Sequence, residues 1–157
     1  TNLTKKGEII ATKLIRRHRL WECFLADKLG FNWSKVHEIA EELEHIKSDE
    51  LVNRLDDYLG NPEYDPHGDP IPTEGGKFNT KKRIKLSEVE TGKSGVVVGV
   101  DDGNSDLLVM LDNLKINIGS KIKMLEKYEY DESCLIENKG EDIQLSSKVC
   151  KNIYIER

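Results

Sequence analysis

The sequence predicts an α+β protein in which a helical domain comes first and a small β-barrel follows. Two observations lead to this fold class. Apolar residues recur with the helical period of about 3.6 in the first part of the chain and alternate with a period of about 2 in the last part. All four prolines lie between Pro62 and Pro72, followed by Gly75-Gly76, a composition typical of a domain boundary. We therefore expect a helical domain at 1–60, a turn and linker at 61–82, and a barrel at 83–157.

Three helices are expected in the first domain. Thr4 can cap a long first helix that ends near Gly30. Ser34 or Asn32 can cap a second helix that runs to about Lys47, and Ser48 can cap a third. The core side of the first helix is marked by apolar residues at helical spacing, namely Ile10, Leu14, Trp21, Leu25 and Leu29.

Histidine and glutamate repeat along the first two helices. His18 and Glu22 lie one turn apart on the first helix. On the second helix four such side chains fall within about 100° of one another, beside the apolar stripe: His37, Glu41, Glu44 and His45. Imidazole with carboxylate is a ligand set for a divalent metal, and the absence of a nearby cysteine favours Mn²⁺ or Fe²⁺ over structural zinc. The run of eight carboxylates between Glu38 and Asp57, taken alone, is typical of a solvated face.

Composition excludes several classes of protein. The 157 residues carry a net charge of −5, which speaks against a nucleic-acid-binding surface. No apolar run approaches the roughly 20 residues of a membrane span, and the first residues do not resemble a signal peptide. The three cysteines are widely spaced and form no C-x-x-C motif, which indicates reduced thiols and a cytoplasmic protein.

The barrel part contains no catalytic signature. Its short expected strands are separated by turns rich in Gly, Asn and Asp: Ile84–Leu86, Gly95–Val100, Leu107–Leu111, Lys121–Leu125, Cys134–Ile136, Asp142–Leu145 and Asn152–Ile155. The acidic segment Asp101–Asp106 lacks the rest of an EF-hand loop, so a polar hairpin turn is expected there. His67 lies in the proline-rich segment, where a single histidine is more often a turn or packing residue than a ligand.

Two alternatives compete with a metal-binding regulatory protein. Glu42-x-x-His45 matches the motif of ferritin-like di-iron enzymes, but a second copy is absent, because Ile15, Ser34 and Tyr64 stand three residues before the other histidines. A purely structural helical dimer would leave the His/Glu pairings as coincidence.

Four phrases of the sequence, together in this order and spacing, resemble the diphtheria toxin repressor family of metal-dependent transcriptional regulators. They are Leu3-Thr4-x-x-Gly7, Arg17-His18-Arg19-Leu20-x-Glu22-x-Phe24-Leu25, Val36-His37-x-x-Ala40-Glu41-x-x-Glu44-His45-x-x-Ser48-Asp49 and Pro66-His67-Gly68-x-Pro70-Ile71-Pro72. The likeness is dense from Leu3 to Pro72 and loose beyond it. It implies a homodimeric sensor of Mn²⁺ or Fe²⁺ that represses metal-uptake genes and is not an enzyme, with a helical dimerisation domain followed by an SH3-like barrel.

The resemblance also implies residue roles. His18, Glu22 and His37 match the family's ancillary metal site, and Glu41, Glu44 and His45 match its primary site. Asp101 and Asn104 align loosely with an acid and an amide that the barrel lends to the ancillary site. The iron-sensing branch has a cysteine where this chain has Glu41, so the manganese-sensing branch is the better match.

The sequence begins where the wing of the family's DNA-reading domain ends. We therefore expect a homodimer that contacts operator DNA only through an N-terminal winged helix-turn-helix outside these residues. Part of the primary site is expected to lie there as well.

Overall fold

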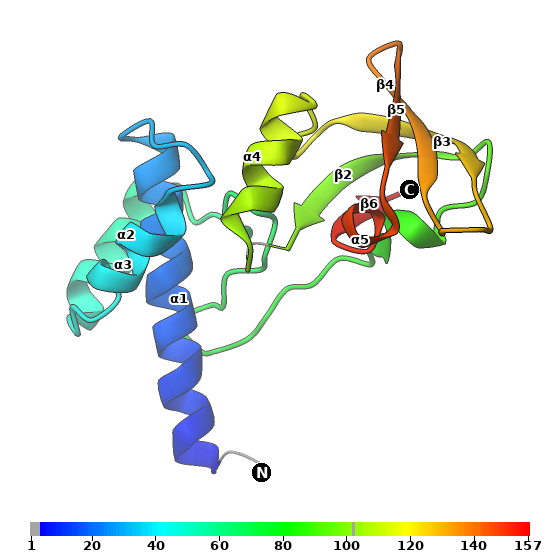
Figure 1. Ribbon diagram of the computed structural model, residues 1–157. Coiled ribbons are helices and arrows are strands. Elements are labelled where there is room, and N and C mark those ends of the chain that lie inside the picture. Colours follow the sequence, from blue (N-terminus) through cyan, green and yellow to red (C-terminus); the bar gives the residue numbers. More distant parts are fainter. Residues whose placement is uncertain (1–3, 102) are drawn as a thin grey trace. The chain divides into compact units, whose positions relative to one another are not determined.

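The structure is a computed structural model that describes residues 4–101 and 103–157 (Figure 1). Leu3, which opens the family-like phrases, and Asp102 of the acidic segment lie outside the described residues. The chain divides into two compact units, one ending at Thr80 and the other spanning Lys81–Arg157. In the described part of the chain, no helix has both the length and the apolar character needed to cross a membrane.

Three helices build the first unit: α1 (Lys5–Asp27), α2 (Val36–Leu43) and α3 (Asp49–Tyr58). The expected caps are confirmed, because Thr4 Oγ1 accepts a hydrogen bond from Gly7 N and Ser48 Oγ accepts one from Leu51 N, each at 3.2 Å. The second helix is shorter than predicted. It ends at Leu43 because the chain tightens into a turn, in which Ile46 N donates to Leu43 O, before Ser48 starts α3.

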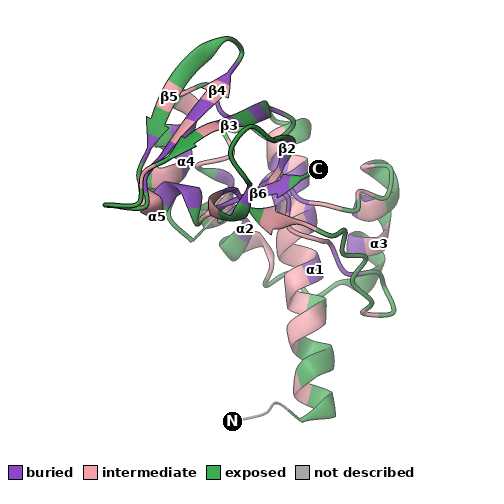
Figure 2. Ribbon diagram, turned by 90° about the vertical axis from the view of Figure 1, so that its right-hand side faces the viewer, coloured by how far each residue is buried: buried purple, intermediate pink, exposed green. Residues whose placement is uncertain are grey.

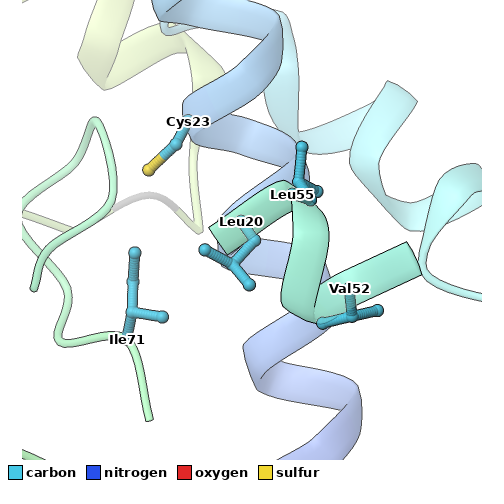
Figure 3. Close-up of a cluster of buried hydrophobic side chains, with 5 residues drawn as sticks. All are labelled: Leu20, Cys23, Val52, Leu55 and Ile71. Atoms are coloured by element: carbon cyan, nitrogen blue, oxygen red, sulfur yellow. The ribbon is translucent and has the colours of Figure 1, made fainter. Parts of the chain in front are cut away.

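The core of the helical unit lies between α1, α3 and the segment that follows α3. Figure 3 shows the side chains that meet there: Leu20 and Cys23 from α1, Val52 and Leu55 from α3, and Ile71. The predicted core stripe was wrong for Ile10 and Leu29, which are 59% and 56% exposed. Leu29 lies past the end of α1, and the buried positions of α1 gather between Arg16 and Leu25 (Figure 2).

The proline-rich segment packs onto the helices. Asp65, His67 and Ile71 are buried, and Tyr64 pairs with Pro70 in an antiparallel bridge. Asp65 Oδ1 accepts hydrogen bonds from His67 N at 2.8 Å and Asp69 N at 2.9 Å, which closes the turn between them. This part of the chain therefore contributes to the helical unit.

The second unit is a six-stranded antiparallel sheet in the order β1-β6-β2-β3-β4-β5. Its strands are β1 (Ile84–Lys85), β2 (Ser94–Val100), β3 (Lys121–Lys127), β4 (Cys134–Asn138), β5 (Glu141–Leu145) and β6 (Ile153–Glu156). The register shifts once between β2 and β6 and once between β3 and β4, which bends the strands. A 3₁₀ turn (Leu86–Glu88) and the short helix α5 (Ser147–Cys150) complete this unit, together with α4. The predicted α+β fold class is confirmed.

One predicted strand was wrong. Leu107–Leu111 lies in a helix, α4 (Ser105–Asn113). Leu108 and Leu111 are buried while Val109 and Met110 are exposed, a spacing that suits a helix and not a strand. Asn104 caps it, accepting from Asp106 N at 2.9 Å. The acidic segment is therefore a connection from a strand to a helix and not the expected hairpin turn.

Candidate metal centre

Three of the predicted ligands meet where α1 and α2 lie side by side. His18 and Glu22 stand one turn apart on α1, and His37 is on α2. His18 Nε2 lies 3.0 Å from Glu22 Oε1 and 3.1 Å from His37 Nδ1, and His37 Nδ1 lies 3.2 Å from Glu22 Oε1. The three atoms form a nearly equilateral triangle.

This triangle fits a divalent ion. Neighbouring ligands of an octahedral ion with bonds of about 2.1–2.3 Å are about 3.0–3.2 Å apart, which matches all three sides. Two nitrogens and one carboxylate oxygen also suit Mn²⁺ or Fe²⁺ chemically. The triangle would fill one face of the octahedron and leave the opposite face for other ligands.

Two further carboxylates fix the orientation of the imidazole rings. Glu44 Oε2 lies 2.6 Å from His18 Nδ1, and Glu41 Oε1 lies 3.3 Å from His37 Nε2. In metal sites the second nitrogen of a ligating histidine usually donates to such a partner, which sets the tautomer. Each ring here would have its remaining nitrogen directed at Glu22.

The predicted primary site is not gathered in the same way. Glu41 and Glu44 contact the histidines of the triangle, and His45 lies exposed beyond the end of α2. Within residues 4–101 and 103–157, Glu41, Glu44 and His45 do not form a cluster of three ligand atoms. Their role as a primary site stays a prediction.

Glu22 is the electrostatic centre of the site, since its side chain is fully buried. Burial opposes its charge, but hydrogen bonds with His18 and His67 outweigh burial and lower its pKa to about 2. The pKa of His18 is raised, because Glu22 and Glu44 outweigh the effect of burial. Protons and a metal ion therefore compete for the same ring nitrogens.

A second buried group lies behind Glu22. His67 Nδ1 is 3.6 Å from Glu22 Oε2, and His67 Nε2 is 2.7 Å from Trp33 O. Burial opposes protonation of His67, but contact with Glu22 raises its pKa to about 9. Burial and the charge of Glu22 raise the pKa of Asp65 to about 7, and Arg19 Nε lies 3.6 Å from Asp65 Oδ2.

Sequence reasoning did not anticipate this group. It treated His67 as a loop histidine and gave Asp65 and Arg19 no role. The one signal was their place inside the family-like phrases or beside them, because periodicity says nothing about which loop side chains become buried.

The metal-free chain should lose stability as the pH rises from about 6.5 to about 9. The folded-state pKa of His67 lies above its ordinary value, so its stabilising effect is complete below pH 6.5 and is lost as the pH rises through about 9. The loss is at most about 3 kcal/mol of unfolding free energy. Urea unfolding in the presence of a chelator measures it, with His67→Gln as the control. Equal pH dependence in both proteins would contradict the expectation.

Asp101 and Asn104 belong to the second unit. Asp101 Oδ1 accepts a hydrogen bond from Gly103 N at 2.9 Å, and Asn104 Oδ1 caps α4. Both side chains line an open cavity of about 450 Å³ together with Lys148 and Asn152. Their contribution to a metal site stays a prediction.

Comparison with known proteins gives the family. Residues 4–73 match the iron-dependent repressor metal-binding and dimerisation domain, and residues 84–157 match the FeoA domain. A solved manganese-dependent transcriptional repressor in complex with manganese is 34% identical, with a TM-score of 0.92, and the match covers 98% of this chain and 73% of that one. The chain belongs to the diphtheria toxin repressor family of metal-dependent transcriptional regulators.

Two curated relatives show how far the family likeness extends. Diphtheria toxin repressor of Corynebacterium diphtheriae is 28% identical over 164 residues, covering 98% of this chain and 71% of the repressor. A probable metal transport system membrane protein of Chlamydia trachomatis is 51% identical over 71 residues, which is 45% of this chain but only 16% of that protein. The chain thus spans part of longer relatives.

Family membership decides between the alternatives. The family consists of transcriptional repressors, which are not enzymes, and nothing supports the ferritin-like enzyme. The structure adds a physical reason, since Glu42 is on α2 whereas His45 lies beyond its last residue, so the two do not share one helix face.

Proposed function

We propose that these 157 residues are the metal-sensing and dimerisation part of a transcriptional repressor that responds to Mn²⁺ or Fe²⁺. The observation that carries the proposal is the triangle of His18 Nε2, Glu22 Oε1 and His37 Nδ1, with sides of 3.0–3.2 Å. These residues would hold the ion of the ancillary site. Glu41, Glu44 and His45 would serve a primary site, and Asp101 and Asn104 would complete the ancillary one.

The mechanism we propose is linkage between metal binding and helix packing. When bound, the ion supplies a positive charge that replaces the protons shared by His18, His37 and Glu22. Because His18 and Glu22 lie on α1 and His37 lies on α2, their joint coordination would favour one packing of these helices over others. In a dimer, a fixed packing sets the spacing of two DNA-reading domains against half-sites about one helical turn apart.

We place operator recognition outside these residues. The part of the chain with the dense likeness matches a metal-binding and dimerisation model, and the whole chain carries a net charge of −5. Backbone phosphates of DNA attract positive surfaces, so such a chain has no electrostatic drive to bind DNA. We expect a cytoplasmic homodimer, the setting in which a repressor of metal-uptake genes would reach both its DNA and the metal pool.

Manganese is the favoured ion. The donor atoms around both proposed sites are nitrogen and oxygen, and Glu41 stands where the iron-sensing branch resembles this chain less well. The similar repressor that was solved with manganese supports the same choice.

Added Mn²⁺ should raise the thermal unfolding midpoint of the chain, whereas Mg²⁺ should leave it nearly unchanged because imidazole is a poor ligand for that ion. At a concentration one hundred times its Kd, Mn²⁺ would stabilise the fold by about 2.7 kcal/mol. Sedimentation of the same samples should show a dimer. A monomer in sedimentation, or equal responses to both ions, would overturn the proposal.

A further inference from the structure

The carboxylate of Glu22 is held from two sides. Its Oε1 faces His18 and His37 in the proposed metal site, while its Oε2 faces His67 Nδ1 at 3.6 Å. Both Glu22 and His67 have no exposed side-chain surface, so no solvent can take the place of either partner. Trp33 O only accepts hydrogen bonds, so the nitrogen 2.7 Å away, His67 Nε2, carries a hydrogen.

We propose that His67 is a positioning residue for the metal site: it holds Glu22 Oε2 so that Glu22 Oε1 stays directed between His18 and His37. The inference rests on the proposed function and adds a residue from the proline-rich segment to it. A carboxylate whose second oxygen is fixed in this way binds an ion without first losing rotational freedom.

His67 is itself held rigidly enough for this role. Its backbone N donates to Asp65 Oδ1 at 2.8 Å, and its ring stacks on that of Trp33 with 6.0 Å between the centroids and 19° between the planes. Asp65 Oδ2 in turn lies 3.6 Å from Arg19 Nε, so the turn is tied to the helix that carries Glu22. The loop before α2, the proline-rich turn and α1 therefore converge on one carboxylate.

A second metal ion among Glu22, Asp65 and His67 is the competing explanation, because these residues bring ligand atoms within 4.8 Å of one another. The surroundings argue against it. Asp65 Oδ1 already accepts two backbone hydrogen bonds, and the guanidinium of Arg19 supplies a positive charge beside Asp65. A divalent cation there would meet a resident cation.

Two substitutions separate the two edges of the ring. The amide nitrogen of asparagine reaches about as far as His67 Nδ1, and that of glutamine about as far as Nε2. His67→Asn therefore keeps a donor for Glu22, whereas His67→Gln keeps only the donor for Trp33 O. Both side chains are uncharged, so loss of charge is common to the two variants.

Calorimetric titration with MnCl₂ compares these variants with the wild-type chain. His67→Gln should weaken Mn²⁺ binding roughly 30- to 100-fold and His67→Asn by no more than about threefold, with unchanged stoichiometry in both. Equal losses in the two variants, or none in either, would overturn the inference. A lost equivalent of Mn²⁺ with the remaining affinity unchanged would show that these residues hold an ion themselves, which also overturns it.

A crystal structure of the Mn²⁺-bound wild-type chain gives a test that needs no folded variant. Glu22 Oε1 should ligate the ion while Oε2 remains on His67 Nδ1, and a Glu22 carboxylate turned away from His67 would refute the inference. The proposed function fails separately: a wild-type chain that binds no Mn²⁺ removes both, whereas a wild-type chain that binds Mn²⁺ without this contact removes the inference alone.

Discussion

Replacing Glu22 with glutamine is expected to weaken Mn²⁺ binding by at least about 100-fold, since even outer partners of metal ligands cost 10- to 100-fold when removed. The substitution keeps the size of the side chain but removes the one negative charge that contacts His18, His37 and His67 together. Without that charge the two imidazoles of the triangle face a neutral amide, and an ion would have to be bound without a carboxylate from α1. Calorimetric titration measures the effect.

Glu42→Gln is the matched control, because it removes the same charge from an exposed position on α2. We expect its affinity for Mn²⁺ to stay within about twofold of the wild-type value, since exposed charges at a distance are screened by solvent. Equal losses in the two variants would mean that the general negative charge of this region, and not the triangle, attracts the ion.

Replacing Leu20 with alanine is expected to lower the unfolding free energy of the helical unit by about 2–5 kcal/mol, the range found for truncating buried leucines. Leu20 is fully buried and packs with Cys23, Val52, Leu55 and Ile71 at the centre of this unit (Figure 3). Because α1 carries two of the proposed ligands, a cavity at Leu20 should also weaken Mn²⁺ binding.

Urea unfolding followed by tryptophan fluorescence measures this loss, since Trp21 packs against the same cluster. Ile9→Ala on the same helix is the control, as Ile9 is 60% exposed and its truncation should change stability by less than about 0.5 kcal/mol. Similar losses in the two variants would contradict the assignment of the core to Leu20 and its neighbours.

Local sequence signals were sufficient for the helix starts. Thr4 and Ser48 cap their helices as predicted, because capping depends on a side chain and a backbone N–H three residues away. The same kind of signal was ambiguous for Leu107–Leu111, where a continuous apolar run suits a buried strand as well as a helix. Burial of Leu108 and Leu111 on one side decides for the helix, and it depends on the rest of the sheet unit.

The metal centre could be predicted only in part, for a similar reason. Helical spacing places His18 and Glu22 together, and the family resemblance adds His37. Whether Glu41 and Glu44 ligate an ion or orient His37 and His18 depends on how α1 crosses α2, which no spacing along one helix reveals. His67 lies 45 residues along the chain from Glu22, and only the folded proline-rich turn brings them together.

Anomalous diffraction at the manganese absorption edge, from crystals of the chain grown with Mn²⁺, tests the central claim most directly. We predict an anomalous peak within about 2.3 Å of His18 Nε2, Glu22 Oε1 and His37 Nδ1. Peaks only among Glu41, Glu44 and His45, or only among Glu22, Asp65 and His67, would contradict the account.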